Sequence, residues 1–255
     1  MTLVAAEIAA ALRTARYGRS LEVKARTGST NDDAKAAIDA GAASGHVIVA
    51  DAQERGRGAH GRAWSSPGGT DLYFSIVERQ TPSPGALPWL TLAVGLGVRE
   101  ALGAYVEAAV KWPNDVLLGT AQRKAAGILV ESSSLGGSLG AIVIGVGIDV
   151  NRVDFAPELE GLATSLRRET GRPHDRSALL AAVLGAIEAQ VAELVRPGGL
   201  AALHGRLSRH LAYRGERVQV EGEVGELLGV AEDGALRLGT ERGERRLRSG
   251  TLRRA

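Results

Sequence analysis

The chain has 255 residues, of which 44% are hydrophobic and 24% charged, a composition typical of soluble globular proteins that excludes wholesale disorder and a coiled coil. The formal net charge of +2 gives weak support for a nucleic-acid partner, and the absence of cysteine excludes disulfides, thiolate metal sites and thiol nucleophiles. No apolar run reaches the roughly 18–20 residues of a membrane helix, and no signal-peptide pattern is seen, so we expect a cytoplasmic protein without a membrane partner.

Hydrophobic periodicity and turn residues predict an α+β protein with a central mixed or antiparallel sheet and flanking helices. In chain order, we expect a helix at 3–16, a strand at 21–26, a helix at 29–41, strands at 46–51 and 72–77, a helix at 87–108, strands at 110–111, 116–118, 125–131 and 141–150, and helices at 173–195 and 198–211. Ser29 with Asp32, or Thr30 with Asp33, resembles a capping box.

Short strands with glycine turns follow residue 212 and predict a small β-barrel. We therefore expect a first domain over residues 1–211 and a second over residues 212–255. The segment Gly136 to Gly140 satisfies G-x-S-x-G, but a strand follows it, so it is interpreted as a hairpin turn and not as a nucleophile elbow.

A loop rich in glycine and arginine follows the strand at 46–51 and carries Arg55, Arg57 and Arg62. It satisfies G-x-G-x-x-G, but the residues RAWSSPGGT that follow it do not begin the helix that a dinucleotide site requires. Glycines let a backbone approach a ligand closely, and arginines donate paired hydrogen bonds to phosphate or carboxylate. The loop predicts an anionic ligand, with a solvated loop or an RNA contact as the alternatives.

Two further segments concentrate polar side chains. Lys111-Trp112-Pro113-Asn114-Asp115 forms one turn, in which tryptophan can stack on a planar ring and the asparagine and aspartate can hold a sugar, a base edge or a metal. Lys124 precedes the apolar strand AAGILVE, where an ammonium is partly desolvated and can face a buried anion. The five histidines show no metal-ligand spacing, so no built-in metal site is predicted.

Together these motifs resemble the biotin–protein ligases. The resemblance rests on S-T-N from Ser29, Gln53 with the glycine–arginine loop from Arg55, K-W-P-N-D from Lys111, KAAGILVE from Lys124 and GVGIDVN from Gly145, in the family's order and spacing. It implies a class II synthetase-like catalytic domain and a C-terminal barrel of the Src-homology-3 type. Because no helix-turn-helix domain precedes the S-T-N motif, we expect the monofunctional type without a DNA partner.

The resemblance implies an ATP-dependent ligase that activates biotin as biotinyl-5′-AMP. The biotin is then transferred to a lysine of the biotin carboxyl carrier protein or domain of an acetyl-CoA or acyl-CoA carboxylase. ATP and Mg²⁺ are the implied co-substrates and biotin the substrate, with Mg²⁺ entering with ATP near Asp115. A sheet edge near residues 141–150 is a candidate homodimer contact.

The resemblance also assigns candidate residues. The implied catalytic residues are Lys124, Arg57 and Arg62. The implied biotin-binding residues are Ser29, Thr30, Asn31, Gln53, Arg57, Gly58, Ala59, Lys124 and Gly127. The implied ATP-binding residues are Arg55, Arg62, Trp64, Lys111, Asn114, Asp115, Asp149 and Asn151. Two positions depart from the family's pattern: Ala59 replaces the usual second loop arginine, and Asp149 replaces the usual asparagine.

Two alternatives stay open. A lipoate–protein ligase would have a similar fold and chemistry, but it would need a long apolar slot where Ser29, Thr30 and Gln53 offer hydrogen-bond partners for a ureido ring. A non-enzymatic nucleic-acid-binding protein would explain the arginine loop and the small barrel. It would not explain K-W-P-N-D together with KAAGILVE.

Overall fold

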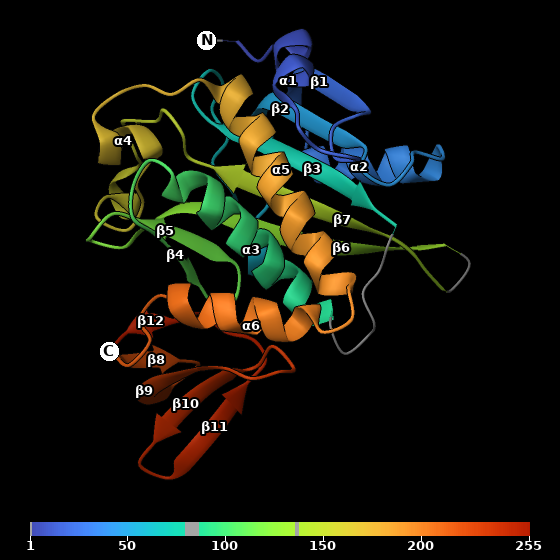
Figure 1. Cartoon of the computed structure of the whole chain (residues 1–255). Coiled ribbons are helices and arrows are strands. Elements are labelled where there is room, and N and C mark those ends of the chain that lie inside the picture. The colour runs from blue at the N-terminus through green and yellow to red at the C-terminus, as the bar shows by residue number, and fades with distance from the viewer. Residues whose placement is uncertain (1, 80–86, 136–137) are drawn as a thin grey trace.

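A seven-stranded mixed sheet forms the larger part of the protein (Figure 1). Its strands are β1 (Leu21–Thr27), β2 (Val47–Gln53), β3 (Leu72–Glu78), β4 (Ala108–Lys111), β5 (Asp115–Leu118), β6 (Arg123–Leu135) and β7 (Ser138–Ile148). In the computed structural model, which describes residues 2–79, 87–135 and 138–255, the strand order is β1-β2-β3-β7-β6-β5-β4. Among the described strands of this sheet, β1 and β2 are the one pair that runs parallel, because α2 (Thr30–Asp39) provides the crossover that parallel neighbours require.

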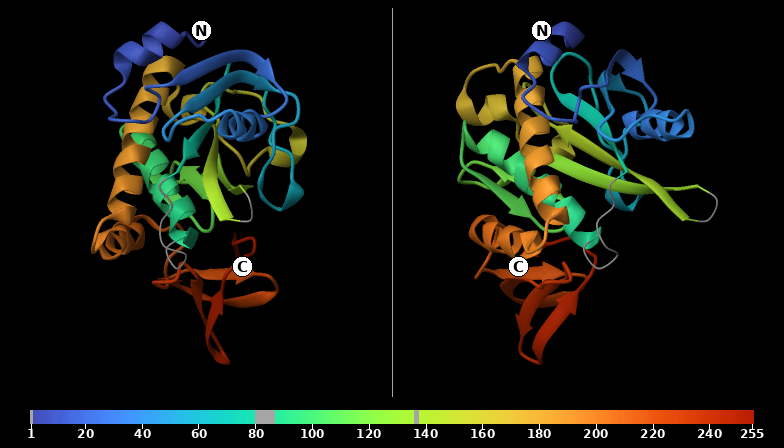
Figure 2. Two further views of the ribbon diagram at one scale, coloured as in Figure 1. Left: turned by 90° about the vertical axis from the view of Figure 1, so that its right-hand side faces the viewer. Right: turned by 45° about the vertical axis from the view of Figure 1, so that its right-hand side comes forward.

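Helices cover both faces of this sheet (Figure 2). The strands alternate accordingly: Ile48 and Val143 pack with α2, while Val49 and Ile144 belong to the larger core on the opposite face. That larger core lies under α3 (Leu87–Gly103) and α5 (Arg176–Val195), which pack against each other. Both faces of the central strands are therefore buried, which explains why β3 is buried over its whole length.

Helix α5 is, in the described part of the chain, the one helix long and apolar enough to cross a membrane. A buried core helix passes the same test of length and composition. The side chains of Leu180, Val183, Leu184 and Ile187 are fully buried, and α5 packs against α3 and against α1 (Ala5–Ala11). Its apolar composition is explained by this packing.

A second sheet follows helix α6 (Gly199–His210) and lies at the lower end of the molecule in Figure 1. Its strands are β8 (Arg217–Val220), β9 (Glu223–Val230), β10 (Leu236–Thr240), β11 (Gly243–Leu247) and β12 (Arg253–Arg254). They pair antiparallel in the order β11-β10-β9-β8-β12. The predicted small barrel is thus a five-stranded antiparallel sheet, and its likeness to a Src-homology-3 domain stays a prediction.

The first helix is shorter than the predicted 3–16. It ends at Ala11, and Leu12 is already extended. Beyond it, the Glu188 carboxylate accepts hydrogen bonds from the backbone N–H groups of Ala15, Arg16 and Tyr17 at 2.6, 2.7 and 2.8 Å. These donors are held by a residue far away in the sequence, so the chain leaves the helical path.

The predicted capping box is wrong. Ser29 occupies the N-cap position of α2, but its side chain makes no capping hydrogen bond. Asp33 accepts from the Thr27 hydroxyl at 2.6 Å, and Asp32 is bound by Arg57. Tertiary partners therefore replace the local cap.

The proposed homodimer edge near residues 141–150 is also wrong. Strand β7 lies in the middle of the sheet and pairs antiparallel with both β3 and β6. The backbone groups of residues 142–148 are consequently occupied on both sides. The predicted turn lies partly outside the described residues, at Gly136 and Gly137, although Leu135 pairs with Ser138 on either side of it.

The remaining differences concern element ends. Helix α3 ends at Gly103 and not near 108, and α5 begins at Arg176, where the Asp175 side chain accepts from two backbone N–H groups. A five-residue helix, α4 (Leu166–Thr170), was not predicted. It follows the segment that lines the site described next.

Candidate active site

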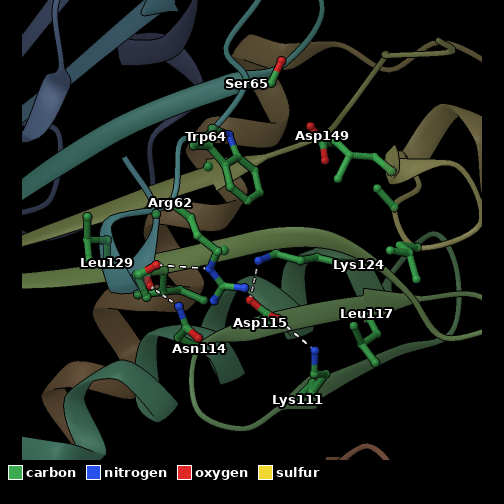
Figure 3. Close-up of a pocket in the computed structure, with 18 of the residues that line it drawn as sticks. Arg62, Trp64, Ser65, Lys111, Asn114, Asp115, Leu117, Lys124, Leu129 and Asp149 are labelled. Carbon is green, nitrogen blue, oxygen red and sulfur yellow. Dashed lines mark hydrogen bonds and ion pairs between the residues drawn. The ribbon is translucent and has the colours of Figure 1, made fainter. Parts of the chain in front are cut away.

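A cavity of about 660 Å³ opens between the two sheets and the glycine–arginine loop (Figure 3). This volume lies within the range of small-molecule sites, about 300–1,000 Å³. Of the predicted site residues, those that line it are Ser29, Thr30, Asn31, Gln53, Arg57, Gly58, Ala59, Arg62, Trp64, Lys111, Asn114, Asp115, Lys124, Gly127 and Asp149. Motifs spread over more than a hundred positions thus meet in one place.

Two predicted residues lie elsewhere. The guanidinium of Arg55 packs against the backbone of Gly28. The side chain of Asn151 donates to the His174 carbonyl at 2.9 Å and accepts from the His174 N–H at 2.8 Å. Neither lines the cavity, so their ATP contact stays a prediction. Trp112, considered as a stacking surface, is also buried away from the cavity.

One end of the cavity is polar but uncharged. Gln53 Oε1 accepts from the Thr30 N–H at 2.9 Å and lies 3.1 Å from the Thr30 hydroxyl oxygen. Gln53 Nε2 donates to Ser66 Oγ at 3.0 Å. Ser75 Oγ lies 2.8 Å from Thr30 Oγ1 and 2.6 Å from Asn31 Oδ1. These contacts fix the orientation of the Gln53, Thr30 and Asn31 side chains, and Asn31 Nδ2 also donates to the Glu131 carboxylate at 2.6 Å.

Ser75 was missed in the sequence. Its signal was a hydroxyl residue between the apolar residues Phe74 and Ile76 of the strand LYFSIVE, in which every residue is buried. A buried hydroxyl in such a strand needs a hydrogen-bond partner. Its partners are the Thr30 hydroxyl and the Asn31 amide, which line the polar end of the cavity.

Glycines form the floor of the cavity. A Cβ atom on Gly147 would lie 2.6 Å from the Trp64 indole, and one on Gly127 would lie 2.9 Å from it. A Cβ on Gly145 would overlap the Asn31 amide. Only glycine lets Trp64 and Asn31 lie directly on β6 and β7.

The arginine loop folds back on itself. The N–H of Gly58 donates to the Arg62 carbonyl at 2.7 Å, and the Trp64 N–H donates to the Gly56 carbonyl at 2.9 Å. At the tip lies the short 3₁₀ turn Ala59–Gly61. The loop is thus a narrow hairpin, and one side of this hairpin borders the cavity.

Arg57 attaches this loop to the rest of the site. Its guanidinium donates to both Asp32 oxygens at 2.8 and 2.7 Å and to Glu131 at 3.3 Å. The hydrogen bonds from Arg57 lower the pKa of Asp32 below its usual range. Burial acts against ionisation of Glu131, but hydrogen bonds from Lys35 and Asn31 still lower its pKa. Both carboxylates thus favour the charged form, and Arg57 is ion-paired with each of them.

Two lysines share one carboxylate in the middle of the cavity. Lys124 Nζ lies 2.6 Å from one oxygen of Asp115, and Lys111 Nζ lies 3.1 Å from the other. Lys124 also lies 5.2 Å from the centre of the Trp64 ring. Figure 3 shows Arg62 extending from the loop toward this group. Three cations around one carboxylate leave a net positive charge, which suits an anionic ligand.

The far end of the cavity contains a buried cluster around Arg152. Arg152 Nε donates to Asp71 at 2.8 Å, and its Nη2 donates to the Ser65 carbonyl at 2.8 Å. Phe155 lies beside it, with the guanidinium carbon 5.4 Å from the ring centre. Burial, followed by repulsion from Asp71, raises the pKa of Asp149 well above its usual range. Sequence reasoning missed Arg152 and Phe155, because their places depend on the fold around Asp71.

The second sheet also reaches the cavity, which no sequence motif indicated. The lining residues that it and its connecting segment contribute are Tyr213, Thr251, Leu252, Arg253 and Arg254. The described residues include no group of three or more histidine, aspartate or glutamate side chains arranged to hold a metal ion.

The chain has clear relatives. The family model described as the biotin/lipoate A/B protein ligase family matches residues 23–149. The bifunctional ligase/repressor BirA of Bacillus subtilis is 30% identical, covering 96% of this chain and 77% of that protein. The biotin–[acetyl-CoA-carboxylase] ligase of Mycobacterium tuberculosis is 35% identical, covering 84% of this chain and 80% of that protein.

A solved structure shows the same architecture. The biotin protein ligase from Aquifex aeolicus in complex with biotin and ATP is similar with a TM-score of 0.81 and 32% sequence identity. The match covers 93% of this chain and 100% of that chain. It therefore extends over both sheets.

Proposed function

Since the chain belongs to the biotin/lipoate A/B protein ligase family, we propose that it is a biotin–protein ligase that uses ATP to attach biotin to a carrier lysine. The carrier is the biotin carboxyl carrier protein or domain of an acetyl-CoA or acyl-CoA carboxylase. The observation that carries this proposal is that one cavity joins a neutral hydrogen-bonding end to a cationic centre at Lys124.

The neutral end suits the ureido ring of biotin. This ring has N–H donors and a carbonyl acceptor but no charge, so its partners should be uncharged groups of both kinds. Ser29, Thr30, Asn31 and Gln53 provide them. The long apolar slot that lipoate requires would not need these groups, so we favour biotin over lipoate.

The cationic centre suits the first half-reaction. A biotin carboxylate oxygen attacks the α-phosphorus of ATP, and the bond to the β-phosphate oxygen breaks to release pyrophosphate. The Lys124 ammonium, held by Asp115, stabilises the negative charge of the carboxylate and the α-phosphate as they approach. No enzyme nucleophile is required, because positioning and charge stabilisation suffice.

The second half-reaction uses the same lysine. A carrier lysine amine attacks the carbonyl carbon of the mixed anhydride, the bond to the phosphate oxygen breaks, and AMP leaves while the amine loses a proton. Lys124 stabilises the charge that returns to the phosphate. Arg57, Gly58 and Ala59 border the intermediate on the loop side, and Arg62 lies toward the pyrophosphate.

Magnesium enters as part of the nucleotide substrate. Mg²⁺ usually binds through one or two carboxylates plus substrate phosphates, and Asp115 is the carboxylate at the cationic centre. Asp115 is already engaged by two lysines. An approach of Mg²⁺ to Asp115 would therefore displace Lys111 or Lys124 toward the phosphates.

The alternative of nucleic-acid binding has little support in the loop. Arg57 is ion-paired with Asp32 and Glu131, so the loop presents less free positive charge than its sequence suggests. We place the ligase reaction in the cytoplasm, and we propose no DNA contact for the fold described here.

The proposed function is tested by measuring the transfer of biotin to a carrier domain. A purified biotin carboxyl carrier domain is incubated with the protein, ATP and Mg²⁺, with either biotin or lipoate, and its mass is measured. We expect the mass to increase by one biotinyl group, only with biotin and only with ATP. An equal yield with lipoate would overturn the substrate assignment, and no modification with either would overturn the ligase function.

A further inference from the structure

Lys124 lies where the regular pairing of the main sheet ends. On one side, β7 pairs with β6 as far as Ile148 opposite Ala126, and the Asp149 N–H adds one bond to the Ala125 carbonyl at 2.8 Å. On the other side, the register between β5 and β6 shifts beside Lys124, which marks a β-bulge that interrupts the ladder. The backbone of Lys124 therefore needs a further partner.

That partner is the segment of residues 162–164, which takes the place of β7 beside Lys124. The Lys124 N–H donates to the Leu162 carbonyl at 2.9 Å, and the Lys124 carbonyl accepts from the Thr164 N–H at 2.8 Å. The two bonds form a parallel bridge between Lys124 and Ala163. This segment engages both hydrogen-bonding groups of the lysine backbone, so its place sets the point from which the side chain starts.

The carboxylate of Glu169 in α4 joins this segment to β6. Glu169 Oε1 accepts from Thr164 Oγ1 at 2.6 Å and from Arg123 Nη2 at 2.7 Å. Thr164 is fully buried, and the Glu169 side chain is 12% exposed. Thr164 ends the segment, and Arg123 immediately precedes Lys124 on β6. One carboxylate thus connects the two stretches of chain that meet at Lys124.

Glu169 is itself held in a fixed place. Its backbone N–H donates to the Ser165 carbonyl at 3.1 Å, and Ser165 Oγ caps α4 by accepting from the Arg168 N–H at 3.1 Å. A Cβ atom on Gly119, in the turn between β5 and β6, would overlap Glu169 Oε2. The carboxylate therefore packs directly on the turn that leads into β6.

The two ends of Lys124 are consequently held by different carboxylates. Asp115 lies 2.6 Å from the ammonium, whereas Glu169 acts on the backbone through Arg123 and Thr164. A lysine side chain is long and flexible, so its ammonium is placed accurately only when both ends are fixed. A misplacement of about 1 Å at a reacting centre can lower a rate roughly 100-fold.

We propose that Glu169 is a positioning residue that places Lys124 for the reaction by fastening residues 162–164 to β6. This proposal rests on the proposed function. Glu169 and Thr164 do not line the cavity, so neither meets a ligand there. Their effect on the reaction reaches the substrates through Lys124.

Three variants in biotin-dependent pyrophosphate exchange test this role. Glu169→Ala removes both bonds, and we expect its kcat to fall by up to about 100-fold while the KM for biotin stays unchanged. Glu169→Gln keeps an acceptor for the Thr164 hydroxyl and should recover much of the loss. Thr164→Val removes the hydroxyl but keeps the shape, and its kcat should also fall. A higher KM for biotin with an unchanged kcat would overturn the proposal.

A double variant tests whether the effect passes through Lys124. In a protein that already carries Lys124→Ala, Glu169→Ala should cause no further loss of exchange, because the side chain that it positions is absent. Losses that multiply would show that Glu169 acts on another part of the site and would overturn the proposal.

The small number of lysines allows a direct spectroscopic test. The four lysines are Lys24, Lys35, Lys111 and Lys124. Protein labelled with ¹³C at the lysine ε-carbons gives an NMR signal for each, and Lys124→Ala identifies the signal of Lys124. We expect Glu169→Ala to shift this signal and to leave those of Lys24 and Lys35 in place. An unchanged Lys124 signal would overturn the proposal even where exchange falls.

Glu160→Gln is the matched control. Glu160 accepts from Arg168 at 3.0 and 3.1 Å, but its side chain is 47% exposed and does not line the cavity, so exchange should be unchanged. If the wild-type protein shows no biotin-dependent exchange, the ligase function fails. If it does and Glu169→Ala exchanges equally fast, only the positioning role fails. Should Glu169→Ala not fold, Glu169→Gln and Thr164→Val decide the question.

Discussion

The Lys124 ammonium owes its position to a single carboxylate. Asp115 holds Lys124 at 2.6 Å and Lys111 at 3.1 Å, and its own side chain is largely buried. A lysine held this way loses much of its rotamer freedom before a substrate arrives. Asp115 is thus a positioning residue for a cation that must meet two anions.

Gln53 provides the residue-scale prediction for the biotin end. Its amide links Thr30 to Ser66, so Gln53→Ala removes a ligand partner and leaves the Thr30 N–H without its acceptor. An unmade buried hydrogen bond costs about 1–3 kcal/mol. We expect the KM for biotin to rise roughly tenfold.

Steady-state kinetics with each substrate varied separately checks this prediction. The KM for ATP serves as the internal control and should stay within experimental error. A comparable increase in both KM values would show that Gln53 supports the whole site and not the biotin end.

At the scale of elements, the paired strands β6 and β7 act as a flat floor. Trp64 lies on Gly127 and Gly147, and this contact lets the loop hairpin close against the sheet. Lys124 on β6 lies beside the same indole, 5.2 Å from the centre of the Trp64 ring. The Arg57 pairs with Asp32 and Glu131 then fix the other side of the hairpin.

Gly147→Ala tests this floor. The added methyl group would lie 2.6 Å from the Trp64 indole, so the indole must move. Overpacking of this kind costs about 1–3 kcal/mol. We expect weaker biotin binding and a changed tryptophan fluorescence, to which Trp64 contributes beside Trp89 and Trp112, measured by titration with biotin.

Gly185→Ala is the matched control, because a Cβ atom at Gly185 in α5 would meet nothing within 4 Å. Alanine there should leave binding unchanged and raise helix stability slightly. Unchanged biotin affinity and fluorescence in Gly147→Ala would contradict the role of the floor.

At the scale of the whole molecule, two indoles, one on α3 and one in the turn between β4 and β5, attach the second sheet to the rest of the protein. Trp89 donates to the Glu232 carbonyl at 2.7 Å, and Trp112 donates to the Gly234 carbonyl at 3.1 Å. Buried residues of both sheets belong to one continuous core. The division into a catalytic domain of residues 1–211 and a second domain of residues 212–255 therefore stays a proposal. Both parts line the same cavity.

Trp112→Phe tests this attachment. Phenylalanine keeps an aromatic ring in the buried site but removes the N–H donor to Gly234. We expect a loss of about 1–3 kcal/mol of unfolding free energy, because a buried carbonyl loses its partner. The KM for ATP should also rise, since the second sheet lines the cavity.

Thermal unfolding and exchange kinetics provide the two readouts. Trp89→Phe, which removes the other indole donor, should destabilise the protein by a similar amount. If Trp112→Phe unfolds like the wild-type protein and keeps its KM for ATP, the indole does not support the shared site.

Sequence patterns predicted most of the site because its residues lie in short continuous motifs. Ser29 to Asn31, Arg57 to Trp64 and Lys111 to Asp115 each place several lining residues within one turn or loop. The strand pattern likewise predicted the elements of the main sheet. At Ser29 to Asn31 the family resemblance was needed, because local chemistry alone suggested a capping box there.

Features fixed by distant contacts could not be predicted. The first helix ends early because Glu188 captures its following N–H groups, and β7 is central because β3 pairs with it from elsewhere in the chain. Trp112 turned out to contact the second sheet and not a ligand. In each case the partner lies far away in the sequence, where no local pattern indicates it.

The most direct test of the account is biotin-dependent exchange of labelled pyrophosphate into ATP, with Lys124→Ala beside the wild-type protein. We expect exchange in the wild-type protein that requires biotin, and a roughly 10²–10³-fold lower rate in the variant, the usual cost of one preorganised donor. Full exchange in Lys124→Ala, or exchange without biotin, would contradict the claim that Lys124 brings the biotin carboxylate and the α-phosphate together.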